Sequence, residues 1–242
     1  MVRVGWLLTL CLVGCGAAIG DDDPSADGAP RADGAAAAAD ASTSPDGAAD
    51  AETTVFAVPD VVDTYLRFNN PTFNYGAAER MCADTTDDDR RILLRIDVSS
   101  LPAGASVVSA DLHLWTGTLT NDLSTQTYSV HRMLESWSEG GQNAAAGAAS
   151  WNERAASTPW TVSGAGTGSR DDAVIGSFVP TAIDTEYTVP LDPELIAGWL
   201  ADSESNFGII IVAAGADGAC FASTEFPTAA KHPTLSVTWT AL

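Results

Sequence analysis

The chain has 242 residues, and 32 acidic against 11 basic side chains give it a net charge of −21 at pH 7. So acidic a protein is a poor partner for nucleic acid, because that binding depends on basic contacts to phosphate. Direct docking on an anionic lipid surface is disfavoured for the same electrostatic reason. The charge therefore argues against both classes of partner, and solubility is its simplest consequence.

Residues 1–14 have the features of a bacterial lipoprotein signal peptide. Arg3 precedes an uncharged apolar run from Val4 to Val13, which is shorter than the ~20 residues that cross a bilayer. The stretch Leu12-Val13-Gly14-Cys15 resembles a lipobox, where a small residue before the cysteine permits cleavage and acylation. The alternative is an ordinary secretory signal that happens to contain cysteine. We expect an exported protein anchored in the cell envelope by lipid on Cys15, with no other membrane contact; Gly16 favours the outer membrane.

Residues 15–54 are predicted to be the acylated cysteine followed by an acidic tether. Nearly all of residues 16–54 are Ala, Asp, Gly, Ser, Thr or Pro, and Ile19 is the one large aliphatic residue among them. Such a segment cannot bury enough apolar surface to offset the entropy lost on ordering. We expect a disordered spacer that lifts the following domain away from the lipid surface.

Residues 55–242 are predicted to form one β-rich domain, because apolar and polar residues alternate with period two. The alternating ranges are 91–97, 107–115, 126–132, 174–179, 186–191 and 234–240, whereas 207–213 is apolar throughout, as in a strand buried on both faces. Asp192 as N-cap and Pro193 at the first helical position begin a short helix. Roughly nine or ten strands and one short helix indicate an all-β, jelly-roll-like two-sheet sandwich.

Two cysteines remain in this domain, Cys82 and Cys220. An even pair in an oxidising compartment is expected to form a disulfide. Zinc is disfavoured because there is no CxxC spacing and because the histidines are scattered through the chain, at His113, His131 and His232.

An ordered set of short motifs runs from about Asp60 to Thr240. It comprises Asp63-Thr64-Tyr65-Leu66-Arg67, Asn74-Tyr75-Gly76, the strand Arg90 to Asp97, Trp137-Ser138-Glu139, Ser150-Trp151-Asn152, Asn206-Phe207-Gly208 and Phe221 to Glu225. In this order the motifs resemble the DNRLRE domains, part of which is classed as family 96 of the carbohydrate-binding modules. The resemblance implies a jelly-roll module that binds glycans without catalysis. Insertions around 143–149 and the Asp-rich loop 84–89 depart from the family pattern, so ligand contacts on those loops do not carry over.

Five side chains are candidate glycan contacts. Arg91 and Arg95 share one face of their predicted strand, and Arg67 is expected near them. Guanidinium groups spaced in this way can bind the carboxylates of an acidic glycan. His113 and Trp115 share the polar face of another strand, where an exposed Trp can stack on a sugar ring. The alternatives are that the arginines pair with acidic side chains of the domain and that a loop covers Trp115.

The loop of residues 84–89 is a candidate calcium site. It offers four carboxylates, those of Asp84, Asp87, Asp88 and Asp89. Calcium takes six to eight oxygen ligands, which clustered aspartates often supply. The loop lacks the glycine turn and terminal glutamate of an EF-hand, and a solvated acidic loop is the alternative. No other cofactor is predicted.

The sequence contains no GxSxG, HExxH or P-loop motif. We therefore expect a non-catalytic cell-surface lipoprotein whose jelly-roll domain binds polysaccharide. Arg67, Arg91, Arg95 and Trp115 together on an open face would favour this function. The same residues in internal ion pairs would favour a structural or adhesion lipoprotein of the envelope. A polysaccharide-cleaving enzyme, the least favoured alternative, would need two carboxylates facing each other across a cleft.

Overall fold

The computed structural model describes residues 50–57, 59–215 and 217–241. The predicted signal peptide, Cys15 and most of the predicted tether lie outside these residues. Within the described residues, no helix is both long enough and apolar enough to cross a membrane.

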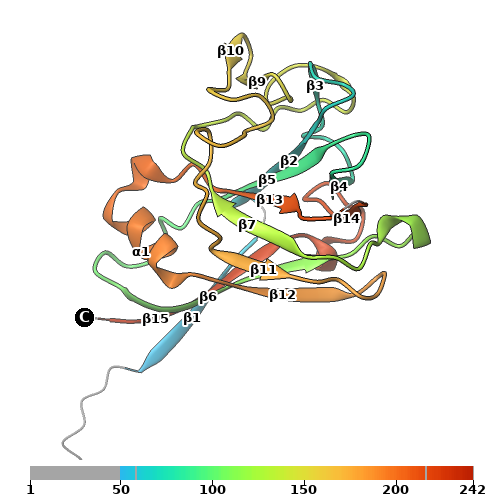
Figure 1. The fold of residues 1–242 in the computed structure, drawn as a ribbon. Coiled ribbons are helices and arrows are strands. Elements are labelled where there is room, and N and C mark those ends of the chain that lie inside the picture. The colour runs from blue at the N-terminus through green and yellow to red at the C-terminus, as the bar shows by residue number, and fades with distance from the viewer. Residues whose placement is uncertain (1–49, 58, 216, 242) are drawn as a thin grey trace, which may run out of the picture. The chain divides into compact units, whose positions relative to one another are not determined.

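Two antiparallel sheets form the two layers of a sandwich (Figure 1). The four-stranded sheet contains, in spatial order, β1 (Ala51–Phe56), β15 (Thr234–Thr240), β6 (Ser106–Trp115) and β12 (Glu186–Leu191). The five-stranded sheet contains β11 (Gly176–Phe178), β7 (Tyr128–Arg132), β13 (Ile209–Ala213), β5 (Arg90–Ile96) and β2 (Val61–Arg67). The predicted all-β two-sheet sandwich is confirmed, and these two sheets hold its nine main strands.

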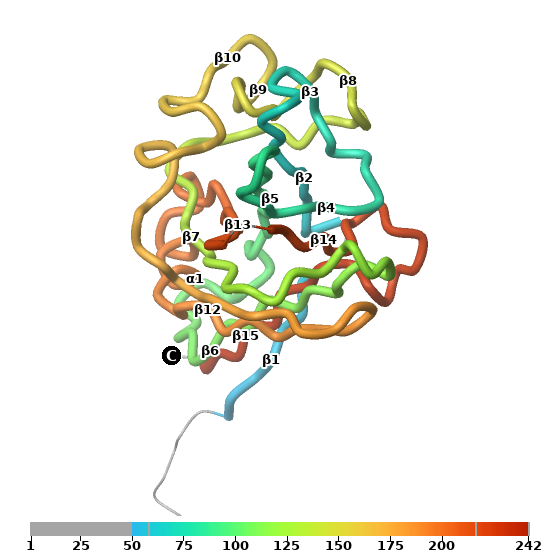
Figure 2. Tube along the Cα trace, turned by 45° about the vertical axis from the view of Figure 1, so that its right-hand side comes forward, coloured from blue at the N-terminus to red at the C-terminus, as the bar shows by residue number. Residues whose placement is uncertain are grey.

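Six shorter strands form three further antiparallel pairs. They are β14 (Ala219–Ala222) with β4 (Arg80–Ala83), β10 (Thr158–Pro159) with β9 (Glu153–Ala155), and β3 (Phe73–Asn74) with β8 (Ala145–Ala146). Three single 3-10 turns also occur, at η1 (Thr120–Asp122), η2 (Ser203–Ser205) and η3 (Ala229–Lys231). In Figure 2 the strands β3, β8, β9 and β10 lie on the far side of the five-stranded sheet from β1, β6 and β15.

The sandwich begins earlier in the chain than predicted. β1 starts at Ala51 and pairs along its whole length with β15, from Ala51 opposite Thr240 to Phe56 opposite Leu235. Residues 51–54, which the sequence assigned to the tether, therefore belong to the four-stranded sheet. Their composition gave no such signal because an edge strand with both faces near solvent needs few apolar residues.

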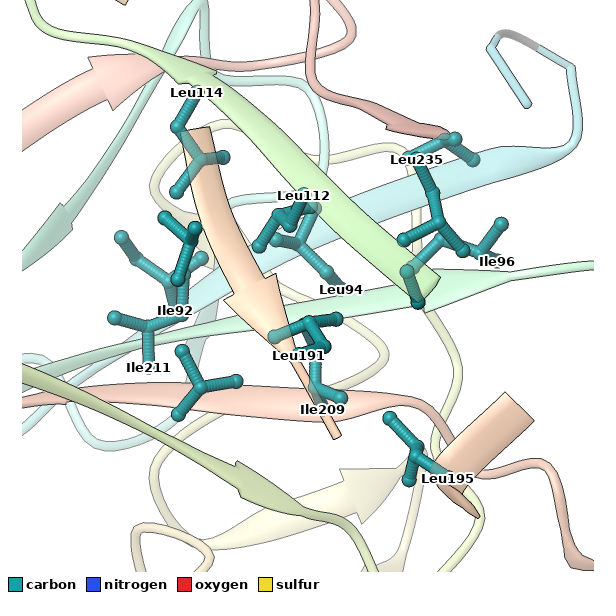
Figure 3. Close-up of a cluster of buried hydrophobic side chains, with 14 of the residues drawn as sticks. Ile92, Leu94, Ile96, Leu112, Leu114, Leu191, Leu195, Ile209, Ile211 and Leu235 are labelled. Carbon is teal, nitrogen blue, oxygen red and sulfur yellow. The ribbon is translucent and has the colours of Figure 1, made fainter. Parts of the chain in front are cut away.

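The main core lies between the two sheets (Figure 3). It joins buried side chains of both layers: Ile92, Leu94, Ile96, Ile209 and Ile211 from one sheet, and Leu112, Leu114, Leu191 and Leu235 from the other. Each fully buried Leu or Ile stabilises the fold by about 1.5–3 kcal/mol relative to an exposed one. The short helix α1 (Pro193–Ala201) packs at one end of this core through Leu195, Ile196 and Trp199. The Asp192 carboxylate caps it by accepting from the Glu194 N–H at 3.0 Å, as predicted.

A second core covers the outer face of the five-stranded sheet. Leu66, Leu93 and Ile210 point outward from β2, β5 and β13 and are buried beneath the chain between residues 133 and 170. That segment contributes three buried tryptophans, Trp137, Trp151 and Trp160. β13 is therefore buried on both faces, as its apolar sequence predicted.

Candidate functional site

Arg91 and Arg95 lie beneath the loops that cover the five-stranded sheet. Arg91 pairs with Asp89 at 2.7 Å, donates to the Gly164 carbonyl at 2.7 Å, and lies 4.8 Å from the centre of the Trp151 ring. Arg95 donates to the Trp137 carbonyl at 3.0 Å and lies 5.3 Å from the centre of that ring. Both side chains fasten the loops to the sheet, so the pairing alternative describes Arg91 better than an open binding face does.

Arg67 does not lie beside Arg91 and Arg95, which corrects the expectation from the sequence. In the register of β2 against β5, Leu66 is opposite Arg91 and Arg67 is opposite Arg90. Directly opposed residues share a sheet face, so Arg67 lies with Arg90 on the other side of the sheet. The sequence could not show which of these arginines share a face, because that depends on the register in which β2 pairs with β5.

Trp115 and His113 belong to the other sheet altogether, on the outer face of β6. Lys231 pairs with Asp184 and places its ammonium 5.2 Å from the centre of the Trp115 ring. His113 Nε2 lies 2.8 Å from the Ser236 hydroxyl. The five candidate glycan contacts therefore do not assemble into one site.

Three of the four aspartates of the 84–89 loop bind neighbouring groups, and the fourth, Asp87, is exposed. Asp88 pairs with Arg67 and Arg90, and Asp89 pairs with Arg91. Asp84 accepts the Thr86 N–H at 3.0 Å. Among the described residues, no group of three or more His, Cys, Asp or Glu side chains could hold a metal ion. The structure thus gives no support to the predicted calcium site.

The predicted disulfide between Cys82 and Cys220 is confirmed. The two residues are directly opposed in the β4–β14 pair, with Cα atoms 4.0 Å apart. The bridge fixes β14 to β4 and lies in the wall of a surface cleft.

That cleft has a volume of about 500 Å³. Its walls come from β2, β4, the start of β5, β14 and η1, together with the loop that follows β3 and the residues just before β8. In Figure 2, β4 and β14 lie beside β2 and β5. Its lining is mainly polar and consists of Tyr65, Ala77, Ala78, Glu79, Arg80, Cys82, Arg90, Asn121, Asp122, Asn143 and Cys220. Its volume lies within the range of about 300–1,000 Å³ that is typical of small-molecule pockets.

Arg80 and Asp122 form one wall of the cleft. Arg80 Nη1 donates to both carboxylate oxygens of Asp122, at 2.7 and 2.6 Å. The Asp122 side chain is only 5% exposed, whereas that of Arg80 is 40% exposed. Asp122 is therefore a buried anchor that orients Arg80, and the rest of the guanidinium group faces solvent.

Arg90, which also lines the cleft, shares the carboxylate of Asp88 with Arg67. Asp88 Oδ2 accepts from Arg67 Nε at 2.5 Å and from Arg90 Nη2 at 2.7 Å. Burial opposes ionisation of Asp88, but the hydrogen bonds from Arg90 and Arg67 outweigh it and lower the pKa of this carboxyl. Asp88 thus fixes both guanidinium groups beside the cleft.

Tyr65 provides the aromatic part of the cleft. One side of its ring is stacked on Tyr75, with centroids 4.3 Å apart and an angle of 23° between the planes. Burial, followed by the neighbouring Tyr75, raises the pKa of Tyr65 to about 12, so the phenol stays neutral. Tyr65 therefore serves as an apolar wall with a hydroxyl, next to two arginines.

Arg80, Arg90 and Asp122 are not among the candidate site residues that the sequence indicates. One signal was available for Arg90, because alternation places it on the opposite strand face from Arg91. Arg80 is two residues before Cys82 and lies on the same strand, β4, which the disulfide joins to β14. The predicted disulfide therefore gave a signal for the position of Arg80 as well. Asp122 and Asn121 lie in a turn with no distinctive pattern, so only the tertiary structure reveals them.

A comparison with protein families bears on the class of function. Residues 54–239 match the model of carbohydrate-binding module family 96. The chain belongs to this family. The match covers nearly the whole sandwich and agrees with the DNRLRE resemblance of the sequence. Membership of family 96 supports carbohydrate binding by a domain of a typically non-catalytic kind. No curated protein matches the chain.

Proposed function

We propose that this family-96 module binds a carboxylate-bearing polysaccharide in the cleft between Arg80 and Arg90. The observation that carries the proposal is the pair of partly exposed arginines, each anchored by a carboxylate, beside Tyr65 in a polar cleft. Among described residues, Arg80 donates only through Nη1 and Arg90 only through Nε and Nη2. The remaining N–H groups are available to an acceptor-rich ligand, and carboxylates suit guanidinium best.

The other lining groups suit a sugar. The amides of Asn121 and Asn143 both donate and accept, which matches hydroxyl groups, and Tyr65 offers an apolar ring beside them. The cleft also supports a non-catalytic function. Its two carboxylates are those of Glu79 and Asp122, and Asp122 is held by Arg80 rather than free for acid–base work.

The proposal is tested by affinity electrophoresis in polygalacturonate, with dextran as the neutral polymer. Arg90→Ala leaves Asp88 paired with Arg67, and Arg80→Lys keeps a cation against Asp122, so both variants should fold. Each should bind polygalacturonate about tenfold more weakly, the effect of losing one charge-assisted contact. Binding by the wild type should weaken with added salt, because exposed charges are screened over ~8 Å at physiological ionic strength.

Arg154→Ala is the matched control. This partly exposed arginine on β9 donates to Ser136 and lies outside the cleft lining, yet its loss changes the net charge equally. If Arg154→Ala weakens binding as much as Arg90→Ala does, only the overall charge matters and the cleft is not the site.

We also propose that the module is displayed on the cell envelope as a lipoprotein anchored through Cys15. The support is the apolar run ending in Leu12-Val13-Gly14-Cys15 and the acidic, Ala-rich stretch that follows. Cys15→Ala should leave the protein unprocessed or release it from the membrane fraction. A Cys15→Ala variant that sediments with membranes at its mature mass would contradict lipidation at this cysteine.

A further inference from the structure

Three carboxylic acids gather where two loops close over the edge strand β2. Asp63 lies on β2 and is 1% exposed, Glu139 is on the loop after β7, and the exposed Glu225 is on the loop after β14. Asp63 Oδ2 accepts the Thr224 N–H at 2.7 Å, and the Asp63 N–H donates to Glu139 Oε1 at 2.9 Å. We call these three acids the carboxyl hub; it joins three segments that lie far apart in the sequence.

The charged groups around Asp63 are mainly of its own sign. Glu225 and Glu139 both repel its ionised form, and Glu225 also repels Glu139. Arg95 on β5 attracts Glu139, and the residue opposite Asp63 on β5 is the apolar Leu94. An ionised Asp63 is therefore both dehydrated and repelled, so its protonated form fits this place best. Burial first, and then the two glutamates, raise the pKa of Asp63 to about 7.

The carboxyl hub is connected to the cleft through the end of β14. Thr224 lies two residues beyond Ala222, which is opposite Arg80 in the β4–β14 pair. Between them, the Ser223 hydroxyl donates to the Ala78 carbonyl at 2.6 Å. Ala78 and Arg80 both line the cleft. The contact of Thr224 with Asp63 therefore helps to hold this wall of the cleft in place.

A second set of contacts connects Glu139 to the same wall. The Glu139 carbonyl accepts an N–H of the Asn74 side chain at 2.6 Å, and a Cβ added at Gly76 would lie 2.6 Å from that carbonyl. The Asn74 side chain in turn accepts the Gly76 N–H at 3.2 Å, directly before the lining residues 77–80. Tyr65, which also lines the cleft, is two residues from Asp63 and so on the same face of β2. The segments that meet at the carboxyl hub thus carry much of the cleft.

We propose that the carboxyl hub is a pH-sensitive switch that holds the cleft in its binding shape while Asp63 carries a proton. This inference rests on the proposed function of the cleft. When Asp63 ionises, repulsion drives Glu139 and Glu225 away from β2, and water enters between the strand and the loops. The wall that carries Arg80 then loses support, so the affinity for a uronate chain falls as pH rises through neutrality.

Calorimetric titration with tetragalacturonate at about pH 6 and about pH 8 tests the switch. The uronates stay ionised throughout, because free carboxylic acids titrate near about pH 4. The wild type should lose about threefold to tenfold in affinity, since one proton released near pH 7 changes a binding constant by at most about tenfold per pH unit. Asp63→Asn keeps an acceptor for the Thr224 N–H without a charge. Its affinity should equal that of the wild type at the lower pH and stay unchanged at the higher one.

Two glutamate variants separate the carboxyl hub from the general charge of the domain. Glu225→Gln removes one repelling charge and so lowers the pKa of Asp63, which should move the fall in affinity to lower pH. Because Glu225 is exposed, this variant decides the matter even if Asp63→Asn fails to fold. Glu194→Gln, on α1, removes an equal charge that is not among the neighbours acting on Asp63, and it should leave the fall where it is.

The possible outcomes keep the switch and the cleft apart. If Asp63→Asn loses affinity with pH as the wild type does, another group such as a histidine sets the pH dependence, and the switch is wrong while the cleft stands. Equal affinity of the wild type at both pH values contradicts the switch in the same way. If the wild type does not bind tetragalacturonate at either pH, the proposed function itself is wrong.

Discussion

Asp63 is a carboxylic acid that the fold places almost entirely out of water. It is 1% exposed, and its Oδ2 accepts the Thr224 N–H at 2.7 Å. Burial raises its pKa first, and repulsion from Glu225 and Glu139 adds to the effect, so that the pKa reaches about 7 in spite of the Thr224 hydrogen bond. Burial and then Glu225 also raise the pKa of Glu139, whose side chain accepts the Asp63 N–H. The two hydrogen bonds of Asp63, to Thr224 and Glu139, join the edge strand β2 to the two loops that carry those residues.

The raised pKa of Asp63 predicts a pH-dependent stability with a definite sign. The unfolded carboxyl loses its proton near pH 3.8, whereas the folded one keeps it until about pH 7. The folded state therefore binds more protons between these values, and stability from this group falls as pH rises through that window, by about 4 kcal/mol at most.

Asp63→Asn removes the titration while keeping an oxygen for the Thr224 N–H. Relative to the wild type, its free energy of unfolding should rise by up to about 4 kcal/mol between about pH 4 and pH 8. Urea unfolding of both proteins at the two pH values measures this, and the comparison cancels the general effect of the acidic surface. A stability difference that does not change with pH would show that Asp63 is ionised in the folded protein.

At the scale of elements, the β4–β14 pair links the stability of the fold to its candidate site. Its disulfide closes a loop with a sequence separation of 138 residues, and β4 carries Arg80. Replacing both Cys82 and Cys220 by Ala should lower the free energy of unfolding by about 2–5 kcal/mol. It should also weaken polygalacturonate binding, because Arg80 loses the fixed strand that positions it.

Reduction provides the control for this prediction. A thiol reductant should weaken binding by the wild type but have no effect on the double alanine variant. If the reduced wild type keeps its stability and its affinity, the bridge contributes to neither.

The elements also show where prediction from sequence succeeds. Alternation located β12 and β15 with their observed ends, because each strand has one face in the core and one outside. The strands β3, β8, β9 and β10 have two or three residues each, too few for a period to develop. For the site, the alternation predicted over residues 91–97 did not include Arg90 and cannot tell which face of the sheet is covered. That depends on residues 133–170 folding over the sheet, which is a tertiary event.

At the scale of the whole molecule, the acidity of the domain limits where an acidic glycan can bind. The domain from residue 55 onward has nine cations against 23 carboxylates, so its overall field repels an acidic glycan. Binding must then rely on individual guanidinium groups that a ligand can reach. Arg91 is held by Asp89 and the Gly164 carbonyl, Arg95 lines a separate pocket together with Asp60 and Asp97, and Lys231 lies over Trp115. Arg80 and Arg90 line the cleft, and each keeps N–H groups that have no partner among the described residues, although nearby carboxylates balance their charge.

The most direct test of the central claim, that the cleft is the carbohydrate site, is an NMR titration of the protein with a uronate-containing oligosaccharide. We expect the largest shift changes at the side-chain Nε–H groups of Arg80 and Arg90 and at the backbone amides of residues 77–82, 121 and 143. Signals of Trp115, His113 and Val55 on the four-stranded sheet should stay in place. Changes centred on Trp115, or none anywhere at saturating oligosaccharide, would contradict the account.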